Sequence, residues 1–150
     1  MTTQLKVNIR KVDAKKVRSL RHSELRKDQD FSTTSYLKDY EIDTFHMAYI
    51  SDDKIVTCAT FYPEKSTKIK SENAYRLRGM ATDSSFQRKG YATGLMNESF
   101  KELKNRDCDM VWCNARLVAV DFYKSSGFKI TGKIFDIAEI GPHYYMYKEI

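Results

Sequence analysis

The sequence lacks long apolar runs, paired cysteines, repeats and low-complexity tracts. No stretch approaches the roughly 18 apolar residues that a membrane-spanning helix needs, and residues 1–4 do not begin a signal peptide. The cysteines Cys58, Cys108 and Cys113 are odd in number and form no C-x-x-C pair, which argues against a disulfide framework and a bound metal. Because Cys58 and Cys113 lie in apolar runs, we interpret them as buried, reduced thiols. We expect a soluble, cytoplasmic protein with no membrane contact and no metal.

Length and charge narrow the class further. At 150 residues the chain can bury roughly 70% of its extended surface, so we expect one domain over residues 1–150. The formal net charge is +6, which suits an anionic partner. Basic residues crowd the first predicted helix and its flanks: Lys11, Lys15, Lys16, Arg18, Arg21, Arg26 and Lys27. No nucleic-acid-binding motif accompanies them, so we interpret them as a solvated helix face and expect no nucleic-acid partner.

The most informative segment is Gln87-Arg88-Lys89-Gly90-Tyr91-Ala92. It follows an extended run, Tyr75–Thr82, and precedes a segment with helical periodicity. The free N–H groups of a first helical turn attract anions, and Gly90 has no side chain to block their approach. The alternative is a surface loop that is basic by chance. The arrangement favours a site for a polyphosphate ligand.

A strand-helix-strand unit surrounds this loop. The strand Met110–Asn114 follows the predicted helix, which indicates a parallel crossover connection. A second helix is predicted over about Leu117–Ser126, ending at Gly127, with another strand from Phe128. The helix predicted directly after the basic loop is amphipathic, and its apolar residues share one face: Ala92, Leu95, Met96, Phe100 and Leu103.

The remaining segments complete a mixed sheet. Phe45–Ile50 and Ile55–Tyr62 predict a hairpin, and residues 27–44 stay unassigned as a candidate substrate lid. The first strand rests on the alternation of Leu5, Val7 and Ile9, and the helix after it carries Asp13 as its predicted cap. In the final strand, His143–Tyr147, we expect Tyr144 and Met146 in the core and Tyr145 and Tyr147 covering its edge. The alternative is that these aromatic side chains form a wall of the acceptor site.

Two motifs resemble the GCN5-related N-acetyltransferase (GNAT) family. Gln87-x-x-Gly90-x-Ala92 is similar to the family's signature for the pyrophosphate of coenzyme A. Asn114-Ala115-Arg116, followed by Ala119-x-x-Phe122-Tyr123-x-x-x-Gly127-Phe128, is similar to its downstream motif. The resemblance covers the whole chain and implies a single-domain α/β (α+β) fold, in which a mixed central sheet with splayed strands is flanked by helices.

The resemblance implies an acetyl-CoA-dependent N-acyltransferase of class EC 2.3.1. Acetyl-CoA would be the cosubstrate, and a primary amine of a small molecule or peptide would attack the thioester directly in a ternary complex. The alternative is a non-catalytic acyl-CoA-binding sensor or interaction protein on the same fold. We expect a monomer or a homodimer. The acceptor itself is not predicted, because pocket-lining loops vary most within a fold.

The resemblance also assigns cofactor-binding residues. Backbone amides at Met80, Ala81 and Thr82 would bind the pantetheine and polarise the acetyl carbonyl. Asn114 would add a hydrogen bond at a strand end, although a turn or capping role fits that residue equally. The pyrophosphate would be surrounded by one continuous set of residues: Gln87, Arg88, Lys89, Gly90, Tyr91, Ala92 and Thr93.

Tyr123 matches the family tyrosine that protonates the departing thiolate, a role that suits a phenol of ordinary pKa near 10. The alternative is an aromatic that packs beside Phe122. The general base does not carry over, because the strand that bears a carboxylate in many relatives has Arg76 and Arg78 here. The remaining candidates are His22, His46, His143, Glu24, Glu64 and Glu139.

Among these candidates we favour His143, since it follows Gly141-Pro142 at the start of the final strand. That region borders the acceptor pocket in the resembling fold. Four arginines could hold an anionic acceptor by bidentate pairing or could be surface charges: Arg21, Arg26, Arg78 and Arg116.

Overall fold

The computed structural model describes residues 8–150, in which seven strands form one mixed sheet. The strand order is β1-β2-β3-β4-β5-β7-β6. The chain divides into two compact units, the first formed by the residues up to Thr60 with Gly79–Glu98, and the second by Phe61–Arg78 with Ser99–Ile150. Three elements contribute to both units: β3 (Lys54–Pro63), β4 (Ala74–Thr82) and α2 (Tyr91–Asn105).

The first unit contains the predicted hairpin. Strand β1 (Ile9–Val12) pairs antiparallel with β2 (Phe45–Ser51), which neighbours β3 in the sheet. Asp52 and Asp53 connect β2 to β3 with φ angles of 49° and 62°, the left-handed pair that a tight hairpin turn requires. The hairpin prediction is confirmed. Of the predicted first strand, Ile9 lies in β1, while Leu5 and Val7 lie outside the described residues.

Helix α1 (Ala14–Leu25) packs its apolar face into the core of the first unit. Val17 and Leu20 are buried there against Cys58 and Ala81. Asp13 stands at the N-cap position, but the predicted side-chain cap is wrong, because the carboxylate makes no capping hydrogen bond. The first turn is instead joined to Asp13 by its backbone, whose carbonyl accepts a hydrogen bond from the Lys16 N–H at 2.9 Å. The unassigned segment 27–44 contains one short 3-10 helix, η1 (Phe31–Thr34).

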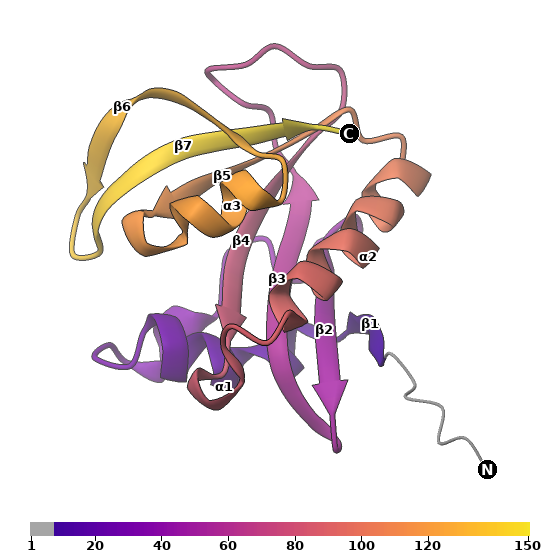
Figure 1. Cartoon of the computed structure of the whole chain (residues 1–150), viewed down its shortest axis with the longest axis vertical. Helices are drawn as coiled ribbons and strands as arrows, with labels where there is room; N and C mark the ends of the chain where they lie inside the picture. The colour runs from indigo at the N-terminus through magenta and orange to yellow at the C-terminus, as the bar shows by residue number, and fades with distance from the viewer. Residues whose placement is uncertain (1–7) are drawn as a thin grey trace. The chain divides into compact units, whose positions relative to one another are not determined.

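The second unit is built on β5 (Met110–Arg116). This strand pairs parallel with β4, from Ala74 opposite Met110 to Arg76 opposite Trp112. On its other side it pairs antiparallel with β7 (Gly141–Glu149), which also pairs with β6 (Lys129–Ile137). Figure 1 shows β6 and β7 as adjacent long strands. The parallel connection predicted between Tyr75–Thr82 and Met110–Asn114 is thus confirmed.

The predicted second helix is present in two parts, η3 (Leu117–Ala119) and α3 (Val120–Ser125). Helix α3 is followed by Gly127, which has a left-handed φ of 98°. The predicted end of the helix at this glycine is confirmed. The prediction for the final strand is right for Met146 but wrong for Tyr145, which is 4% exposed rather than at an edge, and for Tyr144, which is half-buried rather than in the core. Strand β7 has a partner on both sides, and the Tyr145 ring stacks on Trp112 at 5.0 Å. The Tyr145 hydroxyl also hydrogen-bonds Ser66.

All three cysteines are buried free thiols, which confirms the interpretation of Cys58 and Cys113. Burial raises the pKa of Cys58 to about 12, and burial likewise raises the pKa values of Cys113 and Cys108. Since the thiolate is the reactive form, these side chains are poor nucleophiles at neutral pH.

We predict that the native protein resists thiol reagents. With Ellman's reagent at pH 8, less than about one equivalent of thiol should react within minutes, because access and ionisation are both suppressed. In denaturant all three cysteines should react. Rapid labelling of the native protein would contradict the described burial. A low background also makes the same reagent suitable for following coenzyme A release.

Candidate active site

The segment between β4 and α2 forms an exposed basic loop in the first unit. It begins with a 3-10 turn, η2 (Ser84–Phe86), capped by Asp83, whose carboxylate accepts a hydrogen bond from the Ser85 N–H at 2.9 Å. A hydrogen bond from Lys54, with the Ser85 backbone bond second, lowers the pKa of Asp83. The Lys54 Nζ to Asp83 Oδ2 distance is 2.9 Å. The start of the loop is therefore fixed by a carboxylate rather than by apolar packing.

The loop then turns through two left-handed residues before the helix. Arg88 has a φ of 62° and Gly90 a φ of 85°. The Gln87 side chain donates to the Thr82 carbonyl at 3.1 Å and so ties the loop back to the end of β4. No atom lies within 4 Å of where a Gly90 side chain would begin. The bare backbone of Gly90 consequently faces open space.

Helix α2 presents its N-terminus directly after this turn. Its first helical hydrogen bond runs from the Gly94 N–H to the Gly90 carbonyl at 3.0 Å. The N–H groups of Tyr91, Ala92 and Thr93 therefore have no acceptor within the helix, the usual state of a first turn. Because α2 has 15 residues, its dipole adds to the attraction for an anion at this end.

Aromatic contacts hold the helix start in place. Tyr91 packs edge-on against Tyr49 at 4.7 Å and against Phe86 at 5.7 Å between ring centroids. The ammonium of Lys89 lies 5.9 Å from the Phe86 ring. The sequence motif predicts Tyr91 but neither partner, since Tyr49 belongs to β2, far away along the chain.

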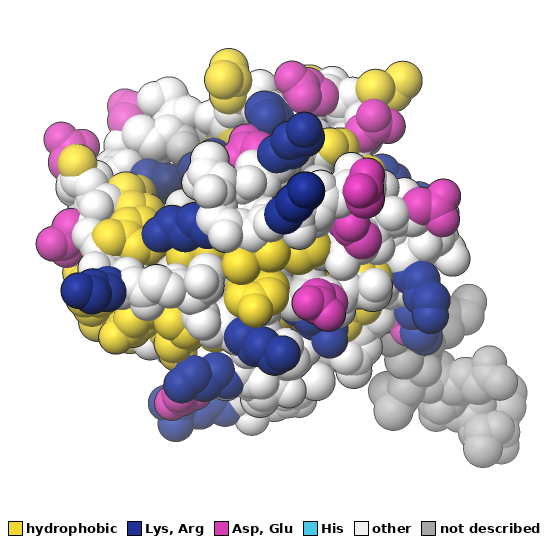
Figure 2. All heavy atoms as spheres, turned by 90° about the horizontal axis from the view of Figure 1, so that it is seen from above, with side chains coloured by type: hydrophobic (Ala, Val, Ile, Leu, Met, Phe, Trp, Pro, Cys, Tyr) yellow, Lys and Arg dark blue, Asp and Glu magenta, His cyan; other side chains and the backbone are white. Residues whose placement is uncertain are grey.

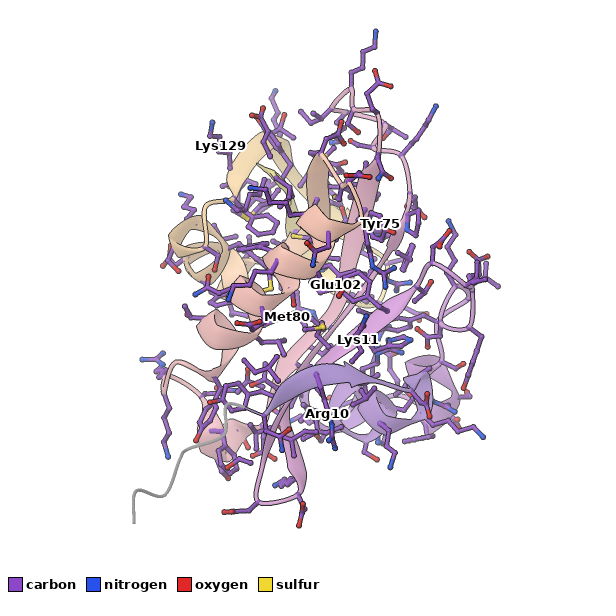
Figure 3. All side chains as sticks on the ribbon, turned by 90° about the vertical axis from the view of Figure 1, so that its right-hand side faces the viewer. Arg10, Lys11, Tyr75, Met80, Glu102 and Lys129 are labelled. Carbon is purple, nitrogen blue, oxygen red and sulfur yellow. The ribbon has the colours of Figure 1, made fainter. Side chains whose placement is uncertain are left out.

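Strand β4 contains a left-handed residue, Gly79, with a φ of 64°. Such a residue within a strand bends it and interrupts the ladder, as in a β-bulge. Met80, labelled in Figure 3, follows the bend and is half-buried. The Thr57 hydroxyl donates to the Thr82 hydroxyl at 3.2 Å. The bend thus lies immediately before the backbone that the family resemblance assigns to the cofactor.

A buried polar group underlies this bend, and we call it the Arg21 cluster: Arg21, Thr34, Asp39, His46 and Thr60. The Arg21 side chain is fully buried in α1 and pairs with Asp39 through two hydrogen bonds of 2.7 and 3.0 Å. It also donates to the Thr34 carbonyl at 2.8 Å and to the Thr60 hydroxyl at 2.6 Å. Both charges therefore have partners inside the first unit.

His46 closes the Arg21 cluster on β2. Its Nε2 lies 3.0 Å from the Asp39 carbonyl, which only accepts, so Nε2 carries the proton. Its Nδ1, 2.7 Å from the Thr60 hydroxyl, is then the acceptor. Burial lowers the pKa of His46, against the opposing effect of its bond to the Asp39 backbone. His46 is therefore neutral, and both ring nitrogens are occupied.

The expectation that Arg21 lies on the surface or holds an acceptor is wrong, because its partner is the buried carboxylate of Asp39. The sequence did not reveal Asp39, which lies in the segment without periodicity, 18 residues from Arg21. The charge of Asp39 did not mark it as a buried partner of Arg21, because several other polar and charged residues lie near it in the sequence.

Tyr123 lies in the second unit, on α3, and is 6% exposed. Burial raises the pKa of its phenol well above the ordinary value, Cys113 acts in the same direction and Arg116 opposes them. Its ring packs on Phe128 at 5.2 Å. A phenol with a raised pKa keeps its proton at neutral pH, and it is a weaker acid toward a thiolate than the phenol of ordinary pKa that the sequence suggests.

Asn114, in β5, and His143, in β7, lie on the face of the sheet opposite to Cys113. Side chains alternate along a strand, so Cys113, which faces Tyr123, and Asn114 point to different sides. Asn114 is opposite Tyr145 and Arg116 is opposite His143 in the register with β7. His143 is 4% exposed, and its Nδ1 donates to the Gly141 carbonyl at 2.8 Å. When the ring is neutral, Nε2 therefore holds the lone pair.

Three other candidate bases already have partners. His22 donates through Nε2 to the Gln29 carbonyl at 3.0 Å. Glu24 accepts from the Ser84 N–H at 3.3 Å. Glu64 pairs with Arg76 at 3.2 Å.

Comparisons with known proteins agree with this architecture. The model of the acetyltransferase (GNAT) family matches residues 14–128. The uncharacterized N-acetyltransferase YitI of Bacillus subtilis is 30% identical over 144 residues, covering 96% of this chain and 97% of that protein. An aminoglycoside 6'-N-acetyltransferase in complex with coenzyme A has a similar structure, with a TM-score of 0.76 and 16% identity over 94% of this chain and 96% of its own. The aminoglycoside 6'-N-acetyltransferase of Enterococcus faecium matches with a TM-score of 0.72 and 15% identity, over 94% and 96%.

The fold is the α/β fold of the GNAT acetyltransferases, with a mixed seven-stranded sheet and a parallel β4–β5 pair. The chain belongs to the acetyltransferase (GNAT) family and is an N-acetyltransferase of class EC 2.3.1. The members of this family take their acetyl group from acetyl-CoA.

Two kinds of feature are absent from residues 8–150. Within this range no helix is long and apolar enough to span a membrane. Over the same range no three His, Cys, Asp or Glu side chains gather as metal ligands would. On the face shown in Figure 2, Lys and Arg side chains lie among Asp and Glu rather than in one continuous basic band.

We predict that His46 makes stability depend on pH. Its folded pKa lies below its unfolded value, so as the pH falls below about 6.5 the unfolded chain takes up a proton that the native ring excludes. The melting temperature should therefore drop between pH 7.5 and 5.5, and His46→Gln, although less stable at pH 7.5, should show a smaller drop. His22→Gln, on the same unit, is the control. An equal drop in wild type and His46→Gln would contradict the assignment.

Proposed function

We propose that this protein transfers the acetyl group of acetyl-CoA to a primary amine of a small molecule or peptide, by direct attack in a ternary complex. The observation that carries the proposal is the open, left-handed turn at Arg88 and Gly90 immediately before the N-terminus of α2. The whole chain acts as one domain. It works as a monomer or a homodimer.

In this proposal the turn before α2 binds the pyrophosphate. The free N–H groups of the first helical turn, from Tyr91 to Thr93, donate to phosphate oxygens, and Gly90 leaves the approach open. Arg88 and Lys89 add positive charge, and Gln87 shapes the loop through its bond to Thr82. The backbone of Met80, Ala81 and Thr82, together with Asn114, binds the pantetheine and polarises the acetyl carbonyl.

The chemistry then needs one base and one acid. The neutral amine attacks the thioester carbonyl carbon, the C–S bond of the tetrahedral intermediate breaks, and the sulfur leaves as a thiolate. Tyr123 gives its phenolic proton to that sulfur, and its raised pKa keeps the proton available until then. His143 Nε2 accepts the proton that the attacking nitrogen loses. Tyr123, in α3, lies toward the Cys113 face of β5, whereas His143, in β7, lies on the Asn114 face, which supports a separation of the two proton transfers.

The structural relatives give a starting set of acceptors. Two of the similar structures are aminoglycoside 6'-N-acetyltransferases, and aminoglycosides carry primary amines. An acceptor screen should therefore include aminoglycosides, simple polyamines and peptides with free amino groups. Release of coenzyme A thiol reports turnover with any of them.

We predict that acetyl-CoA binds saturably in a one-to-one complex by calorimetry, and that Gly90→Glu weakens binding at least about tenfold. The new carboxylate would occupy the space at Gly90 and repel the pyrophosphate. Gly132→Glu is the matched control, because Gly132 is also exposed and has a φ of 78°. Equal affinity of wild type and Gly90→Glu would remove the phosphate-binding role of the loop.

We predict that Tyr123→Phe keeps the acetyl-CoA affinity within about twofold but lowers kcat by roughly a hundredfold, the range of a lost general acid. Tyr147→Phe, a half-buried tyrosine of β7, is the control. Full activity of Tyr123→Phe would leave Tyr123 as a packing residue. If wild type binds acetyl-CoA but releases no thiol with any amine, the non-catalytic acyl-CoA-binding alternative holds instead.

A further inference from the structure

We propose that Arg21 is a positioning residue for acetyl transfer, which acts by holding the bend of β4 at Gly79. The inference rests on the proposed function, since it concerns the backbone that follows this bend. Arg21 contacts neither substrate nor cofactor in this proposal. It acts through Gly79 on the N–H groups of Met80 and its neighbours.

The hydrogen bonds of Arg21 fix the plane of its guanidinium. The group has five N–H donors, and four of them bond to Asp39, the Thr34 carbonyl and the Thr60 hydroxyl. These acceptors come from β3 and from the segment after α1. Because three residues accept these four hydrogen bonds, the guanidinium is held in a single orientation.

The fifth donor is the Nε–H group, which lies in the same plane as the other four. Among the described residues, Arg21 Nε has no hydrogen-bond partner, although the side chain is fully buried. A side chain on Gly79 would begin 2.9 Å from this nitrogen and 3.2 Å from the Tyr36 ring. The guanidinium itself lies 3.9 Å from the centroid of that ring. Arg21 and Tyr36 thus pack so closely against Gly79 that no larger residue fits at this position.

Stability alone does not account for this arrangement. An unpartnered buried donor destabilises the folded state, and well-packed apolar residues often replace buried ion pairs without loss of stability. The arrangement does fix a conformation, because Gly79 has a φ of 64° and the guanidinium and the Tyr36 ring leave no room for a side chain there. The cluster therefore maintains the bend, and the bend sets the direction of the next N–H groups.

The same side chain also holds the segment that precedes β2. Through the Thr34 carbonyl and the Asp39 carboxylate, Arg21 fixes residues that the sequence leaves as a candidate lid. The Asp39 carboxylate in turn accepts from the Tyr36 N–H at 2.9 Å. Both the lid candidate and the bend of β4 therefore depend on one guanidinium.

The first test compares Arg21→Lys with Arg18→Lys. Lysine keeps the charge but lacks the planar fork, so Arg21→Lys should lower kcat at least about tenfold while the KM for acetyl-CoA changes less than about threefold. Arg18 lies on the same helix, half-buried, and bonds Thr34 from the outside at 3.0 Å, so its replacement should change kcat less than about twofold. Equal effects of the two variants, or a loss explained by the unfolded fraction, would overturn the proposal.

A double-mutant cycle tests the route through Gly79. Gly79→Ala places a methyl group against Arg21 Nε, so if Arg21 acts through Gly79 the effects of Gly79→Ala and Arg21→Lys on kcat should be strongly non-additive. Additive effects would overturn the proposal. If Arg21→Lys does not fold, Thr60→Val, which removes one acceptor of the guanidinium, takes its place in the cycle.

Amide hydrogen exchange separates this proposal from the proposed function. In Arg21→Lys or Thr60→Val, exchange over Gly79–Thr82 should accelerate at least about tenfold, while exchange in the middle of α2 stays at the wild-type rate. This readout needs no substrate. Wild-type protein without turnover would refute the proposed function, whereas unchanged exchange over Gly79–Thr82 would refute the role of Arg21.

Discussion

The ion pair between Arg21 and Asp39 is the constraint on which the first unit depends. Its side chains are 0% and 1% exposed, so each charge has lost its water and relies on the other. Removing one partner of such a pair typically costs about 3–5 kcal/mol, comparable with the whole stability of many domains. Through Thr60 the pair reaches His46, and through Thr34 it reaches the segment after α1. A loop of low hydrophobicity is thereby held without a large apolar core of its own.

In the second unit, the alternation of side chains along β5 places the candidate site residues in two different environments. One face of this strand presents Cys113 to the buried phenol of Tyr123, and the other presents Asn114 beside the strand that carries His143. In the proposed mechanism the acid, Tyr123, stays protonated because it is buried, and the base, His143, has a free lone pair on Nε2. The two-residue period of a strand provides both environments within a few residues.

Much of the fold could be predicted because local signals were strong. The amphipathic pattern of α2, the Asp52-Asp53 turn and the stop at Gly127 each depend on near neighbours in the sequence, and the structure contains all three. The basic turn before α2 was predictable for the same reason. The prediction for Tyr145 failed because the position of β7 between β5 and β6 is a property of sheet order, which periodicity does not encode.

The Arg21 cluster could not be predicted for a related reason. Its members come from a helix, an irregular segment and two strands, and each looks like an ordinary polar residue in its own window of sequence. Only the tertiary structure brings a buried cation, a carboxylate and a neutral imidazole together. The site residues of the basic loop differ, since they are contiguous and carry their geometry in a short motif.

The buried cysteines have a consequence for an enzyme whose product is a thiol. Free coenzyme A oxidises to disulfides, which exchange with accessible protein thiolates through mixed disulfides. Cys58, Cys108 and Cys113 are all buried, and their raised pKa values leave almost no thiolate to attack such a disulfide. The protein is therefore built to release coenzyme A repeatedly without becoming covalently attached to its oxidised form.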